Sequence, residues 1–297
     1  MKFFEQYAEG PIELIGQGME GAVYDLGGDL VGKVWFNRSA AEIQPLQSFL
    51  EELAAQKVPF RTPAIQAIDE VDGRAVSVEA KLSGTPLQAA VETGLISQDR
   101  GFDIFAEVVS TLGATVAGPA SKALPLLQRP FWTDRASWGE ALAALVLRRA
   151  AESRSHLQAD VDNFEKVLPQ VVSRLGDVQV ETPRIVHGDI CTPNLLVNEE
   201  GETAALLDWG FLTTAGDNTF DAGTAAGFYD MYGPQARAMD DLLLDRFESE
   251  GHSRQRMLLY RAAYAIVTAT IYSPDASDGH YRWCVANLNR PDVRASL

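Results

Sequence analysis

The hydrophobic pattern of the chain changes near residue 83, and this change restricts the folds open to it. Before that point short β-rich runs dominate, among them IELIGQG, GAVYDL and LVGKVWF, with turn signals at Gly27-Gly28 and Asp72-Gly73. After the break Ser83-Gly84-Thr85-Pro86 the chain becomes helical, with amphipathic stretches at 97–118, 134–155 and 157–175. The pattern predicts an α+β fold with an N-terminal lobe, residues 1–82, and a larger, mostly helical C-terminal lobe, residues 83–297.

One helix is predicted inside the β-rich lobe, at residues 39–56. Pro45 should disturb or restart its first turn. Its apolar positions recur at helical spacing and predict one buried face, formed by Ile43, Leu46, Phe49, Leu50 and Leu53. With five flanking strands, this helix completes a small antiparallel-sheet lobe.

Composition excludes several classes of protein. The chain has 297 residues, of which 46% are hydrophobic and 22% charged, as in a soluble globular protein. It has no apolar run long enough for a membrane span, and Glu5 and Glu9 stand where a signal peptide would be apolar. Two cysteines form no disulfide framework. These features predict a cytoplasmic protein. We also expect it to be a monomer or a homodimer.

The net charge of −16 disfavours nucleic acid and anionic membranes as partners. Acidic residues concentrate in 217–250, which holds eight Asp and Glu against two Arg. Two interpretations stay open. Either these carboxylates bind a cationic partner, or they form an acidic surface that keeps the protein soluble.

A glycine-rich motif, Gly16-x-Gly18-x-x-Gly21-x-Val23, lies between two predicted strands. A dinucleotide-binding motif would require a helix after the glycines, and a strand follows instead. Such a hairpin either folds over a nucleotide, offering backbone N–H groups to its phosphates, or is a plain turn.

Lys33 follows on the next strand, within an apolar run. It either faces solvent at a sheet edge or binds an anion, and the preceding glycine hairpin favours phosphate. A helix glutamate normally holds such a lysine. Glu42, Glu51 and Glu52 are the candidates, and Glu42 is favoured because it lies in the first turn of the helix.

A short β-like segment, residues 184–210, interrupts the helical part and contains HGDICTPNLL and LLDWG. Phosphoryl transfer to a hydroxyl requires a carboxylate that accepts or orients the proton, and a second group on a metal ion. Asp189 and Asn194 have this spacing. A turn at 198–201 would fold Asp208 back beside Asn194, so that both supply oxygen ligands to Mg²⁺. His187 is interpreted as ordering the loop, and Asp221 as capping a helix or bracing the loop.

Taken together, these motifs resemble the protein-kinase-like superfamily, and within it the aminoglycoside phosphotransferase family of small-molecule kinases. The resemblance spans residues 11 to about 290. It implies a bilobal protein-kinase-like fold with Asp189 as the catalytic base, Asn194 and Asp208 as magnesium ligands and Lys33 as the ATP lysine. It also places the adenine against residues 78–82, which makes Glu79 and Lys81 candidate cofactor-binding residues.

The implied function is ATP- and Mg²⁺-dependent phosphorylation of a hydroxyl on a small molecule, such as an aminoglycoside or a related antibiotic, with GTP as an alternative donor. A sugar or amino-alcohol kinase, a protein kinase and a non-catalytic nucleotide-binding protein are the other interpretations. Departures from the family bear on them. Cys191-Thr192-Pro193 replaces the usual His-Pro-Gly, whereas HGD in place of HRD and the lack of an A-P-E motif disfavour a protein kinase.

Overall fold

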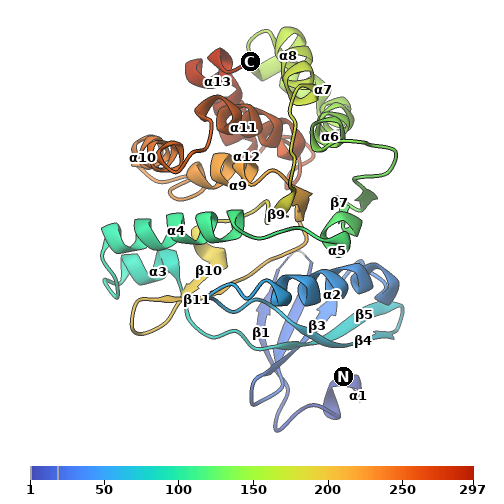
Figure 1. Cartoon of the computed structure of the whole chain (residues 1–297). Helices are drawn as coiled ribbons and strands as arrows, with labels where there is room; N and C mark the ends of the chain where they lie inside the picture. The colour runs from blue at the N-terminus through green and yellow to red at the C-terminus, as the bar shows by residue number, and fades with distance from the viewer. Residues whose placement is uncertain (1, 19) are drawn as a thin grey trace. The chain divides into compact units, whose positions relative to one another are not determined.

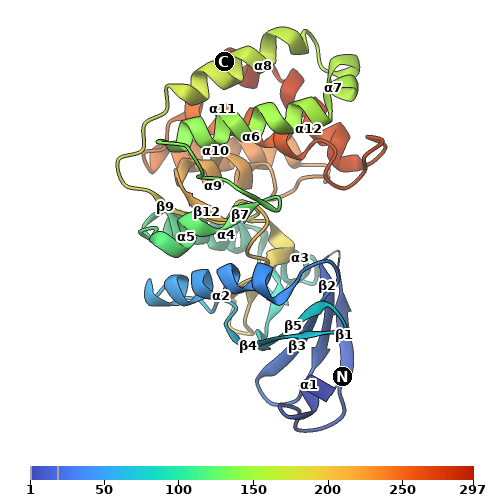
Figure 2. The ribbon, with the colours of Figure 1, turned by 90° about the vertical axis from the view of Figure 1, so that its right-hand side faces the viewer.

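The computed structural model describes residues 2–18 and 20–297. The chain forms two compact units, each assembled from three segments. The first comprises Met1–Gly101, Gly118–Leu124 and Pro193–Asp208; the second comprises Phe102–Ala117, Pro125–Thr192 and Trp209–Leu297. The first unit contains the main sheet, and the second is mostly helical (Figures 1 and 2).

A five-stranded antiparallel sheet forms the body of the first unit. Its strands are β1 (Glu13–Gln17), β2 (Gly21–Asp25), β3 (Leu30–Trp35), β4 (Ile65–Val71) and β5 (Arg74–Ala80). They are hydrogen-bonded in the order β1-β2-β3-β5-β4, so β3 lies at the centre of the sheet. The predicted turns join β2 to β3 and β4 to β5. Gly27, Gly28, Asp72 and Gly73 all have positive φ there, a conformation that glycine and aspartate tolerate best.

Helix α2 (Ala40–Ala55) is the predicted helix of this unit. Its buried side chains are the five predicted ones, Ile43, Leu46, Phe49, Leu50 and Leu53. The expected disturbance at Pro45 is absent, because the helix runs through this residue without interruption. Pro45 lacks the N–H that would bond to the Ala41 carbonyl, so the helix forms without this one hydrogen bond. Glu42 accepts hydrogen bonds from the backbone N–H (2.8 Å) and hydroxyl (2.7 Å) of Ser39, which caps the helix.

The short helix α1 (Lys2–Glu5) lies against the sheet through Phe4. Phe4 forms a buried cluster with Leu26, Val76 and Val78. Gly32 of β3 makes room for the Phe4 ring, since a Cβ at this position would lie 2.7 Å from the ring. The alternation of side chains along β3 therefore places Gly32 on the face of the sheet that bears α1, and Lys33 on the other face.

A smaller sheet completes the first unit. Its strands β6 (Thr85–Pro86), β10 (Leu195–Val197) and β11 (Thr203–Leu206) are joined in the order β11-β10-β6. The break at residues 83–86 thus contributes a strand to this unit, and α3 (Leu87–Glu92) follows it. Helix α5 (Pro119–Ala123) also belongs here.

The second unit surrounds the buried helix α11 (Arg254–Thr268), in which every residue from 257 to 268 is buried. Two further helices, α9 (Thr219–Ala226) and α6 (Trp138–Glu152), lie against it (Figures 1 and 2). The remaining helices are α4 (Gln98–Gly113, whose first residues belong to the first unit), α7 (Arg154–Asp160), α8 (Phe164–Gly176), α10 (Ala236–Ser249), α12 (Gly279–Asn289) and α13 (Pro291–Ala295). The two-stranded sheets are β9 (Arg184–Val186) with β12 (Thr214–Gly216), and β7 (Pro125–Leu126) with β8 (Arg129–Pro130).

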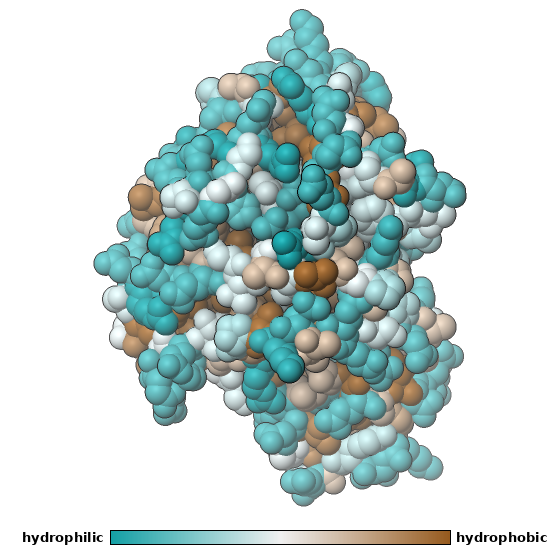
Figure 3. Space-filling view, viewed as in Figure 1, coloured by the Kyte–Doolittle hydropathy of each residue, from teal (hydrophilic) through white to brown (hydrophobic). Residues whose placement is uncertain are grey.

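Hydrophilic side chains cover most of the face shown in Figure 3, with hydrophobic ones in small separate patches. Among the described residues, no helix has the length and apolar character needed to cross a bilayer.

Candidate active site

The glycine motif forms the hairpin between β1 and β2. Gly16 pairs with Val23 across the two strands, and the Gly18 N–H donates to the Gly21 carbonyl over 2.9 Å. A Cβ at Gly16 or Gly18 would meet no atom within 4 Å, whereas a Cβ at Gly21 would lie 2.3 Å from the Val34 carbonyl oxygen. Gly21 is therefore required by the packing of the sheet, and the other two glycines leave the hairpin open. Met19 of this motif lies outside the described residues.

Lys33 lies on the central strand, between Val23 of β2 and Ser77 of β5. This position excludes the sheet-edge interpretation. Its Nζ lies 3.5 Å from the centre of the Trp35 ring, and its ion-pair partner is Glu20, at 3.8 Å. Trp35 is buried, and its Nε1 donates to the Ser77 hydroxyl (2.9 Å). The ammonium group thus lies on a firmly held aromatic side chain.

The predicted pairing of Lys33 with Glu42 is wrong, because the Glu42 side chain caps its own helix at Ser39. These hydrogen bonds also lower the pKa of the Glu42 carboxyl. Glu51 is exposed. Glu52 instead accepts backbone hydrogen bonds at the start of α5. The partner of Lys33 comes from the glycine motif and not from α2.

Asn194 and Asp208 are brought together by the hairpin of β10 and β11. Leu195 pairs with Leu206, and the Leu207 N–H donates to the Asn194 carbonyl over 2.8 Å, so Asp208 follows directly beside Asn194. Asp208 has a φ of +56°, in the left-handed region that few residues other than glycine, asparagine and aspartate adopt. Its backbone is thus held out of the regular strand geometry at the point where the strand ends.

The charge of Lys33 affects the pKa of the Asp208 carboxyl. Its removal from water raises the pKa of Asp208; Lys33 opposes this rise and Glu20 adds to it. Asp208 is an exposed residue, so its carboxyl is only partly removed from solvent. Within the described ranges no cluster of three His, Cys, Asp or Glu side chains is placed to hold a metal ion. A metal ion bound by Asp208 would need other oxygen ligands, and Asn194 and phosphate oxygens are of the right kind.

Glu79 and Lys81 lie at the end of β5. The Ser77 hydroxyl donates to Glu79 over 2.6 Å, which extends the hydrogen-bond chain from Trp35. Lys81 forms an ion pair with Asp25 (2.5 Å), and its N–H donates to the Asp29 carbonyl (2.8 Å). Both side chains therefore hold the sheet in this structure, and their contact with adenine stays a prediction.

In the second unit, the loop that carries Asp189 follows β9 and is held by Asp221 of α9. The two carboxylate oxygens of Asp221 accept hydrogen bonds from the N–H groups of His187 and Gly188, both over 2.8 Å. Burial raises the pKa of Asp221 to about 7, although these hydrogen bonds lower it; the charge of Asp189 adds to the rise. The interpretation of Asp221 as a brace for the loop is confirmed.

His187 orders the same loop from inside. It is fully buried, its Nδ1 accepts the Asp189 N–H over 3.1 Å, and its ring lies 4.4 Å from the ring of Trp209. The Thr213 hydroxyl donates to the His187 carbonyl (2.9 Å) and accepts the Gly210 N–H (2.8 Å). The sequence analysis did not predict that Thr213 and Trp209 help to hold this loop. Only the position of Trp209 in the DWG motif could have indicated its role.

The sequence comparison decides the family. Residues 11–258 match the phosphotransferase enzyme family, APH. The chain belongs to this family. It is therefore an enzyme, a phosphotransferase that acts on hydroxyl groups of small molecules. No curated protein matches the chain in sequence.

Solved structures show that this family member has the kinase-like fold of the aminoglycoside phosphotransferases. The GDP complex of aminoglycoside 2'-phosphotransferase-IIIa has a TM-score of 0.62 and 16% identity, covering 100% of this chain and 97% of that chain. The macrolide 2'-phosphotransferase MphH from Brachybacterium faecium has a TM-score of 0.55 and 17% identity, covering 95% and 92%. The aminoglycoside phosphotransferase APH(3'')-Id from Streptomyces rimosus has a TM-score of 0.56 and 15% identity, covering 88% and 95%.

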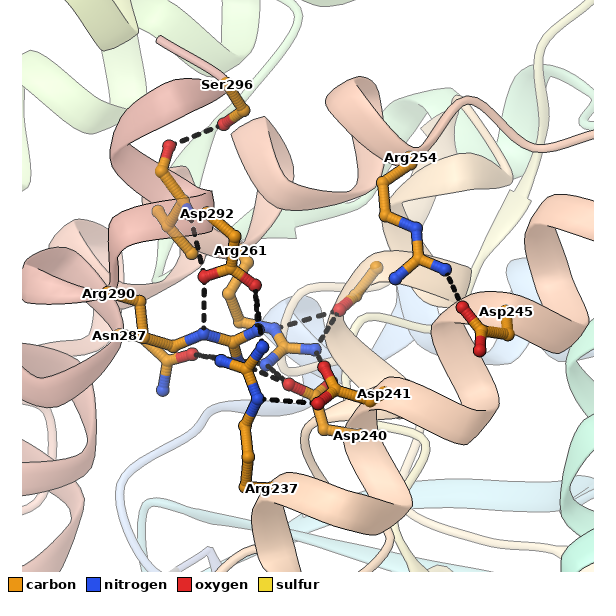
Figure 4. A network of polar contacts seen from close by, with 12 residues as sticks. Arg237, Asp240, Asp241, Asp245, Arg254, Arg261, Asn287, Arg290, Asp292 and Ser296 are labelled. Atoms are coloured by element: carbon orange, nitrogen blue, oxygen red, sulfur yellow. Dashed lines mark hydrogen bonds and ion pairs between the residues drawn. The ribbon is translucent and has the colours of Figure 1, made fainter.

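The acidic segment of this phosphotransferase, residues 217–250, is engaged within the chain. Each of its eight carboxylates accepts a hydrogen bond from another residue. The partners are Tyr260 and Arg256 for Asp217, the loop for Asp221, Gln235 for Asp230, Arg261 and Arg290 for Asp240, Arg237 for Asp241, Arg254 for Asp245 and Glu248, and Arg246 for Glu250. Figure 4 shows several of these pairs around the buried Arg261. The carboxylates of this segment therefore have partners within the chain, some in the buried cluster around Arg261 and others at the exposed surface.

Proposed function

We propose that the chain, with ATP and Mg²⁺ bound, transfers the γ-phosphoryl group of ATP to a hydroxyl of a small molecule. The observation that carries this proposal is the grouping within the first unit. The hairpin of β10 and β11 places Asn194 beside Asp208, and Asp208 lies within the electrostatic reach of Lys33. Structures of family members with GDP, ATP and ADP support a nucleotide as the donor, and GTP is the alternative.

In this proposal the first unit binds the nucleotide. Lys33 contacts the α- and β-phosphates, and the open hairpin at Gly16 and Gly18 offers backbone N–H groups to them. Asp208 and Asn194 would hold Mg²⁺, a fit supported by their oxygen donors and by the exposed surface of Asp208. Bound Mg²⁺ would neutralise the charge that develops on the transferred phosphate.

The loop of the second unit supplies the base. Asp189 would accept or orient the proton of the acceptor hydroxyl. The brace from Asp221 and the buried His187 keep the loop in one conformation, so that the base needs little reorganisation during reaction. Residues 1–82 would then serve as the nucleotide lobe, and residues 83–297 would supply the base and the acceptor contacts.

A coupled ADP-release assay tests this function. The acceptor panel contains aminoglycosides, macrolides, sugars and amino alcohols. Kanamycin and streptomycin represent the aminoglycosides, because similar phosphotransferases have been solved with these two compounds. Asp189→Asn should lower kcat by about 10²- to 10⁴-fold with any accepted compound while nucleotide binding persists. Full turnover in this variant would contradict the role of Asp189.

A further inference from the structure

Two cationic side chains of the first unit lie over the ring of Trp35. The Lys33 Nζ is 3.5 Å from the centre of the ring, and the Arg38 guanidinium carbon is 5.4 Å from it. The ring is buried and held by its hydrogen bond to Ser77, so it is a fixed platform for both cations. Two like charges held over one ring repel each other, and an anion beside them lowers the energy of both.

The anion in this structure is the carboxylate of Glu20. Its Oε1 lies 2.5 Å from Nη2 of Arg38, and its Oε2 lies 3.8 Å from Nζ of Lys33. Glu20 belongs to the glycine motif, the segment that we expect to cover the phosphates of a nucleotide. A carboxylate of the chain itself therefore lies where Lys33 would meet phosphate oxygens.

Of these three charged side chains, Glu20 is the one that can leave at the lowest cost. The exposed fraction of the side chain is 44% for Glu20, against 17% for Lys33 and 23% for Arg38. An exposed ion pair is weak, because water and salt compete with it. Charge-assisted hydrogen bonds to phosphate are stronger, so the several negative charges of a triphosphate would win the competition for both cations.

The backbone is fixed at both ends of the Glu20–Arg38 ion pair. The Phe36 N–H donates to the Glu20 carbonyl (2.9 Å), and the Ala75 N–H donates to the Arg38 carbonyl (2.8 Å). Moving either backbone would break these hydrogen bonds. A change in the side-chain rotamer of Glu20 is enough to release both cations, and it leaves their own backbone in place.

The charge of Glu20 also reaches the carboxylate that we expect to hold Mg²⁺. Glu20 adds to the rise in the pKa of Asp208, whereas Lys33 opposes this rise. If the Glu20 carboxylate stayed in place, it would repel both Asp208 and a bound triphosphate. The departure of Glu20 therefore relieves two unfavourable interactions.

We propose that Glu20 is an internal substitute for the nucleotide phosphates: a bound nucleotide displaces its carboxylate from Lys33 and Arg38, and Arg38 then contacts the phosphates as a second cation. Arg38 thereby becomes a nucleotide-binding residue. Glu20 lowers the affinity of the chain for nucleotide, because each binding event must first break the ion pairs of this residue. The proposal rests on the proposed use of a nucleotide as the phosphoryl donor.

Isothermal titration calorimetry on the full chain, without an acceptor, measures the Kd for ATP, pyrophosphate and adenosine in the presence of Mg²⁺. We expect Glu20→Gln to lower the Kd for ATP by about fivefold, the factor that corresponds to an exposed ion pair. Pyrophosphate should show the same gain, because it consists of phosphates alone. The Kd for adenosine, which has no phosphate, should stay within about twofold of wild type.

Arg38→Gln shows whether Arg38 contacts phosphate or only holds Glu20. In the Glu20→Gln background, where this carboxylate is gone, the change should raise the Kd for ATP by about tenfold relative to Glu20→Gln alone. In the wild-type background the rise should be smaller, because the change also removes an ion pair that the nucleotide has to break. The four proteins form a double-mutant cycle.

Two matched variants remove the same charges from other places in the first unit. Glu51→Gln changes an exposed residue of α2, and Arg74→Gln changes an exposed residue of β5. Both should keep the Kd for ATP within about twofold of wild type, because exposed charges farther away are screened. These controls separate a local effect at Lys33 from an effect of net charge.

The inference and the proposed function fail differently. A Kd for ATP that is unchanged or higher in Glu20→Gln overturns the inference, even though wild type binds ATP. An equal gain with adenosine or in Glu51→Gln also overturns it, and so does a silent Arg38→Gln in the Glu20→Gln background. GTP replaces ATP in these titrations if wild type binds only GTP. Wild type that binds neither nucleotide contradicts the proposed function itself.

Discussion

At the scale of single residues, Asp221 combines two opposing effects. It is buried, which favours the neutral carboxyl, yet both oxygens accept backbone hydrogen bonds, which favour the carboxylate. Its pKa of about 7, raised from 3.8, means that the folded protein retains a proton which the unfolded chain loses at lower pH. The contribution of Asp221 to the free energy of unfolding is therefore largest below about pH 4 and decreases as the pH rises to about 7.

Asp221→Asn should remove this pH dependence. The variant should be less stable at every pH, because its amide presents an N–H to one of two backbone N–H donors. The stability difference from wild type should be largest near pH 4 and smaller by several kcal/mol, as an order of magnitude, at pH 7. Urea unfolding of wild type and Asp221→Asn between pH 4 and pH 7 measures this difference in the free energy of unfolding. A difference that does not vary with pH would contradict the raised pKa.

The glycines of the hairpin provide a matched pair. Gly21→Ala places a Cβ 2.3 Å from the Val34 carbonyl oxygen, so the central strands must separate. We expect a loss of about 1–3 kcal/mol in the free energy of unfolding. Gly16→Ala meets no atom within 4 Å and should change stability by less than about 0.5 kcal/mol. Chemical denaturation of both variants compares the two sites, and equal losses would show that close packing at Gly21 is not the reason for this glycine.

At the scale of elements, α2 shows what a periodic pattern can and cannot predict. The spacing of apolar residues predicted its buried face correctly, because burial follows the local periodicity of a helix. The same spacing gave no means of distinguishing the partners of its glutamates. Glu42 turns back to Ser39, three residues away, whereas Glu52 reaches residues 118–121, which lie far along the chain.

Glu52 connects α2 to the start of α5. Its carboxylate accepts the N–H groups of Gly118 (2.9 Å), Ala120 (2.8 Å) and Ser121 (3.1 Å), and also the Ser121 hydroxyl. Glu52→Gln loses acceptor capacity for these donors and should lower the free energy of unfolding by about 1–3 kcal/mol. Glu51→Gln, at the exposed neighbouring residue, should change it by less than about 0.5 kcal/mol. Thermal unfolding of the two variants should separate them; similar melting temperatures would argue against this connection.

At the scale of the whole molecule, the order of elements could be predicted from the sequence, but the pairing of distant residues could not. The β-rich start, the helix at 39–56 and the hairpin at 195–206 all follow from local patterns. Helix α1 has only four residues, too few to show a periodicity. The roles of Trp209, Thr213 and Glu20 depend on residues that lie far away in sequence or on a turn whose shape no pattern specifies.

For the acidic segment too, the composition did not reveal which residues the carboxylates contact. Its excess of carboxylates left open a cationic ligand, yet Asp240 is buried between Arg261 and Arg290 (Figure 4). Arg261 also donates to the Gly223 carbonyl of α9 (2.9 Å from Nε) and to Asn287 of α12 (3.2 Å). One buried guanidinium thus joins α9, α10 and α12 to α11, and it acts on the helix whose Asp221 holds the catalytic loop.

Arg261→Leu should therefore weaken the second unit as a whole. The change leaves the Gly223 carbonyl and part of Asp240 without donors, and we expect a loss of about 3–5 kcal/mol in the free energy of unfolding. Arg237→Ala removes ion pairs to Asp241 and Asp292 from the exposed rim of the same network, and should cost less than about 1 kcal/mol.

Hydrogen exchange at the His187 and Gly188 amides gives the decisive measurement. If Arg261 positions α9, these two amides should exchange faster in Arg261→Leu than in wild type. In the control variant Arg237→Ala, their exchange rates should equal those of wild type under the same conditions. Unchanged protection at both amides would mean that the network stabilises the helices without acting on the loop.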